Sequence, residues 1–389
     1  MHFSARTNWN TEESELARTL AARRDSGLTL CDLSNANPTQ CGFQYGHNLL
    51  AALANPDALT YDPNPKGLLS ARRAVATYYA DHGVALSPDK LTLTVSTSEA
   101  YSFLFQLLCD PGSEVLVPQP SYPLFDFLAT LSDVRLVSAP LVYDHGWQID
   151  PEGFRRAITP KTRAIVLVHP NNPTGHFTKP WETEFLAQLC REHSLALIVD
   201  EVFLDFSLAG QSPATFAAGL DGVNCFTVSG ISKICGLPQM KAAWLTVTGP
   251  DSVESLNRLE VIADTFLSMN APVQAALPQW LECRRGIQSQ VLSRLKRNLA
   301  ALDHLLAGQK LVCRLEVEGG WYAVLRIPAL APDDETALQL LHRGVYLHPG
   351  SFFSMPPSGW LVVSLLTPED EFRVGVMLLV DYFAKNQIS

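Results

Sequence analysis

Three short apolar runs, each followed closely by a polar residue, constrain most strongly what this chain can fold into. The runs RAIVLV, LALIVD and CFTV occupy residues 163–168, 195–200 and 225–228. Runs this apolar are typical of strands buried on both faces, as in an open α/β sheet, whose ligands bind outside the carboxyl ends of the strands. Asn172, Asp200 and Lys233 follow or close these runs. We therefore expect the three side chains to converge on one site.

Lys233 lies in the segment SGISKICGLPQMKAAW, and the flanking apolar runs predict a loop that leaves the end of a strand. Its neighbours are Gly, Ser, Ile and Cys, which favours a partly desolvated amine that can form a Schiff base with a carbonyl. An ordinary solvated surface lysine is the alternative. Asp200 closes an apolar strand, and burying an unpaired carboxylate is costly. Asp200 is therefore expected to face a partner.

A second polar cluster lies in LTLTVSTSEAYSFLFQLL, which reads as a buried strand that runs directly into a helix. Ser96, Thr97 and Ser98 stand at the turn. Free backbone N–H groups and small hydroxyls at a helix N-terminus make a site for a phosphate dianion. The alternative is that the three residues only cap the helix.

Length and composition describe an ordinary globular chain without a polyanion-binding surface. The chain has 389 residues, 47% of them hydrophobic and 17% charged, and a formal net charge of −10. No nucleic-acid partner is expected from this charge. The eight cysteines form neither a CxxC pair nor a zinc-like cluster, so we expect no metal and a reducing, cytoplasmic location. No stretch approaches the ~18 unbroken apolar residues of a membrane span.

Helix signals outside these motifs are clear. Asn10 as a cap, with acidic residues after it, predicts a helix from Asn10 to Arg24. A second helix is predicted from about Leu68 to His82, and residues 251–306 have a long helical pattern. The C-terminal part then mixes short strands with helices, as in an α+β unit.

Taken together, these motifs resemble the pyridoxal-phosphate (PLP) enzymes of the class I/II aminotransferases, which have the aspartate aminotransferase fold. The resemblance extends from Tyr61 to Pro368 and rests on several separated motifs in the family's order, including HPNNPTG, LIVDEVF and SGISK. It implies an α/β fold, with a three-layer large domain on a mostly parallel central sheet and a smaller α+β domain built from both termini. We expect the large domain over residues 46–275 and the small domain over 1–45 and 276–389.

The resemblance also assigns roles to individual residues. Lys233 would carry PLP as a Schiff base and then move a proton, while Asp200 pairs with the pyridine nitrogen. The residues assigned to cofactor binding are Lys233, Asp200, Asn172, Tyr122, Ser96, Thr97, Ser98, Lys241, Ser232 and Tyr61. Tyr122 is expected to stack on the pyridine ring. Tyr61 is expected to reach the PLP phosphate of a neighbouring subunit, which implies a homodimer with shared active sites; plain packing is the alternative for both tyrosines.

Four positions depart from the family's pattern. Lys241 replaces an arginine that clamps the phosphate, Phe203 replaces a tyrosine that donates to the cofactor, and Gly230 replaces a phosphate-binding serine, for which Ser229 or Ser232 are substitutes. The fourth is Val362, which stands where members that use α-amino acids commonly carry a carboxylate-binding arginine. The unplaced candidates for that work are Arg326, Arg343 and Arg373.

Three functions are therefore compared. The first is an aminotransferase that moves an amino group between an amino donor and a keto acid or carbonyl acceptor, with an atypical site for the substrate carboxylate. The second is a PLP-dependent lyase or decarboxylase on the same fold, because altered carboxylate binding at Val362 can redirect which Cα bond breaks. The third is a non-catalytic protein that uses the fold for binding, against which the retained Lys233 and Asp200 argue.

Overall fold

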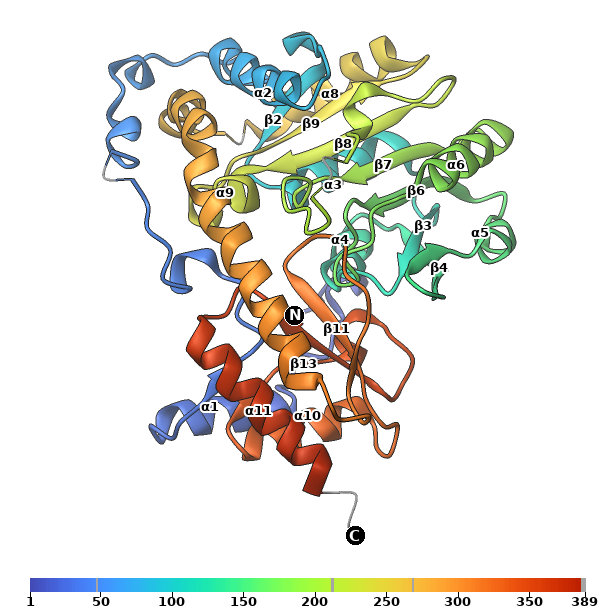
Figure 1. The fold of residues 1–389 in the computed structure, drawn as a ribbon. Helices are drawn as coiled ribbons and strands as arrows, with labels where there is room; N and C mark the ends of the chain where they lie inside the picture. The colour runs from blue at the N-terminus through green and yellow to red at the C-terminus, as the bar shows by residue number, and fades with distance from the viewer. Residues whose placement is uncertain (47, 211–212, 268, 386–389) are drawn as a thin grey trace.

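A computed structural model describes residues 1–46, 48–210, 213–267 and 269–385. An eight-stranded mixed sheet forms the core of its larger part (Figure 1). In spatial order the strands are β2 (Leu91–Thr94), β9 (Ala243–Thr248), β8 (Cys225–Gly230), β7 (Ala196–Asp200), β6 (Thr162–Val168), β3 (Glu114–Gln119), β4 (Arg135–Tyr143) and β5 (Trp147–Ile149). The five neighbours from β8 to β4 run parallel, whereas the β2–β9, β9–β8 and β4–β5 pairs are antiparallel. The predicted mostly parallel sheet is confirmed.

Alternate residues of the central strands pack against helices on opposite faces of the sheet. Val166 and Ile198 belong to one apolar cluster, and their neighbours Ile165 and Leu197 belong to another. The first cluster includes residues of α3 (Thr97–Leu108), α4 (Leu124–Leu131) and α8 (Ser252–Phe266). The second includes residues of α5 (Pro151–Ala157) and α6 (Pro180–His193). Since period-2 alternation places successive side chains on opposite faces, this part of the chain has the three layers that were predicted.

A smaller part of the molecule contains segments from both ends of the chain. Its antiparallel sheet has the order β10 (Cys313–Arg314), β11 (Tyr322–Arg326), β14 (Trp360–Ser364) and β13 (His348–Pro349). The N-terminal β1 (Cys31–Asp32) pairs with β12 (Val345–Tyr346). The helices here are α1 (Glu15–Asp25), α10 (Asp333–His342) and α11 (Glu369–Lys385). The predicted α/β fold class with a smaller second unit is thereby confirmed.

One long helix connects the two parts of the molecule. Helix α2 (Leu69–Asp81) packs on the β2–β9 edge of the large sheet, and α9 (Ala271–Leu306) runs from that edge down to the smaller part (Figure 1).

Short 3-10 helices lie at Ala5–Thr7, Pro38–Gln40, Ala51–Ala54, Pro56–Leu59, Pro88–Lys90, Phe216–Ala218, Pro238–Met240 and Gly350–Phe353. Within the described ranges, no helix combines the length and apolar character needed to cross a membrane.

Two local predictions were wrong in detail. Helix α1 begins at Glu15 and not near Asn10, because the Ser14 hydroxyl accepts a hydrogen bond from the Ala17 N–H at 3.1 Å and caps it. The Asn10 side chain instead accepts from the Glu12 N–H at 2.9 Å, outside the helix. Lys233 lies in a one-turn helix, α7 (Ile231–Ile234), where a loop was predicted.

Candidate active site

A cavity of about 300 Å³ lies at the carboxyl ends of β6, β7 and β8. Asn172, Asp200 and Lys233 all line it, so the expected convergence of these three side chains is found. The lining also includes six further residues predicted for the site, Ser96, Thr97, Ser98, Tyr122, Ser232 and Lys241. Tyr61 lines a different groove and does not reach this cavity.

Strand β8 and the helical turn that follows it direct the Lys233 side chain into the cavity. Its Nζ lies 4.9 Å from the ring centroid of Trp321 and 5.7 Å from that of Phe203. Burial lowers the pKa of Lys233 to about 8, although the Asp200 carboxylate acts in the opposite direction. A substantial fraction of the amine is therefore neutral near pH 8, as a lysine nucleophile requires.

Asp200 is the last residue of β7, and its side chain is buried at the base of the cavity. One carboxylate oxygen accepts from the Val202 N–H at 3.0 Å, and the other accepts from the Tyr101 hydroxyl at 3.3 Å. Burial raises the pKa of Asp200 to about 6, which both donors oppose. Among the described residues no cation lies within ion-pair distance of this carboxylate. The site thus presents a buried acid that lacks a cationic partner from the chain itself.

Asn172 and Tyr122 line the same cavity as Asp200. Asn172 is 8% exposed, and its Oδ1 atom has no hydrogen-bond partner. A buried acceptor without a donor is costly unless a ligand donates to it. Tyr122 packs edge-to-face on Phe125 at 5.9 Å and leaves 40% of its surface accessible, so a face of the ring is available for stacking.

The N-terminus of α3 forms a polar end of the cavity. The Ser96 hydroxyl accepts from the Glu99 N–H at 3.1 Å and caps the helix, so the capping alternative holds for this residue. The Ser96 O–H can still donate to an anion, as can the first-turn N–H groups of Thr97 and Ser98. Lys241 adds positive charge from a left-handed backbone position at φ 52°. A helix N-terminus with a lysine beside it suits a phosphate.

The two serines that could replace the phosphate-binding serine absent at Gly230 differ in their positions relative to the cavity. Ser232 lines the cavity. The Ser229 hydroxyl is fully buried in β8 opposite Trp244 and lies outside the lining. Gly230 itself is closely packed, because an added Cβ would lie 2.9 Å from the carbonyl oxygen of Ala242. Ser232 is therefore the better placed substitute.

Two tyrosines of the site were missed by the sequence reasoning. Tyr101 donates to Asp200, and its position one helical turn after Thr97 was a usable signal. Tyr322 lines the cavity from β11, and burial raises the pKa of its phenol. No local sequence pattern identifies Tyr322, because it reaches the cavity only through the packing of the smaller sheet.

None of the arginines proposed to replace the one missing at Val362 lines the cavity. The Arg326 guanidinium lies 4.1 Å from the Trp360 ring centroid, and that of Arg343 lies 5.0 Å from the Tyr382 ring centroid. Val362 is fully buried in β14, where it pairs with Val324. Among the described residues, Lys233 and Lys241 are the basic side chains of the lining.

Comparison with known proteins identifies a family. The family model "Aminotransferase class I and II" matches residues 33–375. The chain is 31% identical over 282 residues to an alanine aminotransferase from Mycobacterium tuberculosis, covering 70% of this chain and 65% of that relative's length. It is 26% identical to a glutamate-pyruvate aminotransferase from Escherichia coli, covering 89% and 88% of the two chains. The solved alanine aminotransferase from Pyrococcus furiosus superposes with a TM-score of 0.90 at 22% identity, covering 99% of this chain and 100% of that one.

The side chains of the cavity fit PLP. The buried Asp200 carboxylate lacks a cation, which a pyridinium nitrogen supplies, and the α3 N-terminus with Lys241 suits the phosphate. Asn172 lines the same cavity, where its amide N–H can donate to the phenolic oxygen, and the Lys233 amine suits the aldehyde. Fold, cavity and family match agree, and the chain is a member of the class I and II aminotransferases, a family of PLP-dependent enzymes.

Proposed function

We propose that this chain is a PLP-dependent aminotransferase, which moves an amino group between an amino donor and a keto acid or carbonyl acceptor. The observation that carries the proposal is the Lys233 amine, whose pKa burial lowers to about 8 and which lines one cavity with the buried Asp200 carboxylate. When bound, PLP supplies an electron-withdrawing ring. Lys233 holds the cofactor and then moves a proton between the substrate Cα and the C4′ atom of PLP.

The other residues of the lining receive positioning and binding roles. Asp200 keeps the pyridine nitrogen protonated, Asn172 binds the phenolic oxygen, and Tyr122 stacks on the ring. The phosphate is assigned to Ser96, Thr97, Ser98, Ser232 and Lys241. Phe203 supplies apolar surface where a tyrosine hydroxyl is usual, so this chain offers PLP one donor fewer.

The preferred substrate is proposed to be an amino donor whose carboxylate is not bound in the usual way. No arginine belongs to the described lining, and Val362 is enclosed by other apolar side chains. The phenols of Tyr122 and Tyr322 line the cavity instead. These neutral groups favour a donor with an apolar or aromatic portion over one with a second carboxylate.

The first experiment is to follow the visible absorbance of PLP-loaded protein while amino acids and amines are added without any keto acid. Conversion of the bound cofactor to its amine form establishes the half-reaction, and the compounds that respond report whether an α-carboxylate is required. Release of carbon dioxide or ammonia with the PLP absorbance unchanged would favour the lyase or decarboxylase instead. The named relatives are aminotransferases, which weighs against that second function.

We also propose a homodimer with shared active sites. Tyr61 is 77% exposed and lines a groove with Leu267, which is 61% exposed, while the neighbouring Leu59 is 92% exposed. Exposed apolar side chains around a groove favour an interface. Because Tyr61 does not line the cavity of its own chain, a role in cofactor binding requires a second copy.

Hybrid dimers test this arrangement. A mixture of Tyr61→Ala and Lys233→Ala chains, each inactive alone, forms hybrids in which one site keeps both residues. If the sites are shared, random mixing restores about a quarter of the wild-type activity. If Tyr61 serves the cavity of its own chain, no hybrid has an intact site and the mixture stays inactive.

Two further proposals concern organisation and location. The large unit is assigned to residues 46–275 and the small unit to residues 1–45 and 276–389, so that α9 belongs to both. We place the protein in the cytoplasm, which is supported by eight cysteines that are all free. Limited proteolysis and cell fractionation test the two assignments.

A further inference from the structure

A side chain of the long helix α9 forms a hydrogen bond with the helical turn that carries Lys233. The side-chain amide of Gln288, on α9, donates to the Ile234 carbonyl at 3.1 Å. Gln288 is 9% exposed and does not line the active-site cavity. Within this four-residue turn the Ile231 and Lys233 carbonyls accept from backbone N–H groups that follow it, whereas the Ile234 carbonyl accepts from the Gln288 side chain.

Asp205 holds the Gln288 amide in this orientation. One Asp205 carboxylate oxygen accepts from Gln288 Nε2 at 3.0 Å and from the Tyr78 hydroxyl at 3.1 Å. Nε2 of Gln288 therefore has two acceptors, Asp205 and the Ile234 carbonyl. The terminal torsion of a glutamine is soft, so a fixed acceptor is needed to keep the amide aimed at one carbonyl.

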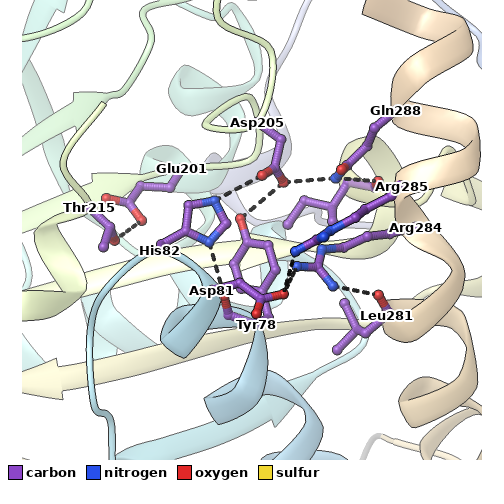
Figure 2. Close-up of polar contacts among 11 residues, drawn as sticks. Tyr78, Asp81, His82, Glu201, Asp205, Thr215, Leu281, Arg284, Arg285 and Gln288 are labelled. Atoms are coloured by element: carbon purple, nitrogen blue, oxygen red, sulfur yellow. Dashed lines mark hydrogen bonds and ion pairs between the residues drawn. The ribbon is translucent and has the colours of Figure 1, made fainter. Parts of the chain in front are cut away.

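His82 in turn fixes Asp205. Nε2 of His82 lies 2.9 Å from the second Asp205 oxygen, and Nδ1 lies 2.9 Å from the Tyr78 carbonyl (Figure 2). A carbonyl and a carboxylate only accept, so both ring nitrogens must donate and the imidazole is held as a cation. Burial alone would lower the pKa of His82, but Asp205 and the carbonyl outweigh it and raise the pKa. The Asp205 carboxylate is thus held by an ion pair and two neutral donors.

We propose that Asp205 and Gln288 are positioning residues for Lys233. His82 and Tyr78 orient Asp205, Asp205 orients the Gln288 amide, and that amide holds the turn so that the Lys233 amine faces the cofactor. The chain of contacts joins α2, the segment after β7, α9 and α7, which no local sequence pattern connects. The inference rests on the proposed role of Lys233.

The test measures how fast PLP becomes joined to Lys233 in protein that was first freed of cofactor. In this step the lysine nitrogen bonds to the aldehyde carbon of PLP and the aldehyde oxygen leaves as water. Borohydride then reduces the C=N bond, and mass spectrometry quantifies the labelled lysine. Gln288→Met keeps the volume and removes both contacts. The matched control is Gln290→Met, because Gln290 lies on the same helix and donates to the Gln44 carbonyl at 2.9 Å and to the Gly286 carbonyl at 3.3 Å, not to a residue of α7.

We expect Gln288→Met to slow the joining about tenfold or more, since small misplacements of a reacting group cost rates of this order. Gln290→Met keeps the wild-type rate. The second readout is the affinity for PLP without the covalent bond, measured by fluorescence in Lys233→Ala protein. Adding Gln288→Met to this background changes that affinity less than about twofold if Gln288 acts only through the lysine.

Two results would overturn the proposal. One is joining at the wild-type rate in Gln288→Met. The other is a loss of PLP affinity of more than about twofold when Gln288→Met is added to the Lys233→Ala background, which indicates general damage to the cavity. If Gln288→Met does not fold, Tyr78→Phe removes one donor to Asp205 and keeps the ring; we expect slower joining there too, and an unchanged rate counts against the proposal. Wild-type protein that never joins PLP would refute the role of Lys233 itself, which is a separate outcome.

Discussion

Glu201 makes the stability of this protein depend on pH in a way that can be worked out from its surroundings. The side chain directly follows Asp200 in sequence and is fully buried. It accepts hydrogen bonds from the Thr215 hydroxyl and the Phe216 N–H, both at 2.6 Å. Burial raises the pKa of Glu201 from 4.5 to about 7, although both donors lower it. The folded protein therefore holds this proton more tightly than the unfolded chain does.

The sign and size of the effect follow from the two pKa values. Below pH 4.5 the group is protonated in both states, and its contribution to stability is fully present. Glu201 ionises above pH 4.5 in the unfolded chain but only near pH 7 in the folded protein. Its contribution to stability therefore decreases over this range and is lost once the pH has risen through about 7. The difference corresponds to about 3 kcal/mol, most of which is lost between pH 5 and pH 8.

The substitution Glu201→Gln removes the titration and keeps the shape. We expect the free energy of unfolding of the PLP-free variant to fall less between pH 5 and pH 8 than that of the wild type, by about 2 kcal/mol. Urea unfolding at the two pH values measures this difference, and titrating groups that do not interact with Glu201 cancel because both proteins share them. Glu254→Gln, on the exposed surface of α8, is the matched control. Equal pH dependence in wild type and Glu201→Gln would refute the reasoning.

Three further predictions concern the cavity. Asp200→Asn removes a negative charge that favours the protonated Lys233 amine, so the pKa of Lys233 falls below about 8. The pH dependence of reductive methylation in PLP-free protein measures this pKa, and an unchanged pKa contradicts the expected interaction. Phe203→Tyr adds a hydroxyl donor that favours the deprotonated form of the Schiff base between Lys233 and PLP, so the pH midpoint of the PLP absorbance change falls. A rise in this midpoint would indicate that the new hydroxyl does not donate to the cofactor. Val362→Arg puts a guanidinium among apolar side chains and lowers the free energy of unfolding by about 3 kcal/mol or more. Its melting temperature measures this, and a stable variant that gains activity toward α-amino acids would show that the cavity can admit the arginine.

The sequence predicted the part of the site that follows from strand order. Asn172, Asp200 and Lys233 each follow an apolar run, and parallel strands bring such positions to one edge of a sheet. The same reasoning failed for Tyr322, because its approach depends on how the smaller sheet packs against the larger one. It also failed for Gln288, which touches the carbonyl of a residue 54 positions away. Contacts set by tertiary packing leave no periodic trace in the sequence.

The charge balance of the cavity limits what the substrate can be. Lys233 must lose its proton to react, and so it cannot also serve as a permanent partner for a substrate carboxylate. If Lys241 binds the phosphate, both basic side chains of the described lining are committed. A donor with an α-carboxylate then depends on a cation from a second copy of the chain or on the neutral phenols of Tyr122 and Tyr322, which bind an anion more weakly than an arginine does. If the neutral lining binds the donor, amines with and without an α-carboxylate should respond equally in the absorbance assay. A strict requirement for the α-carboxylate would instead indicate a cation from the partner subunit.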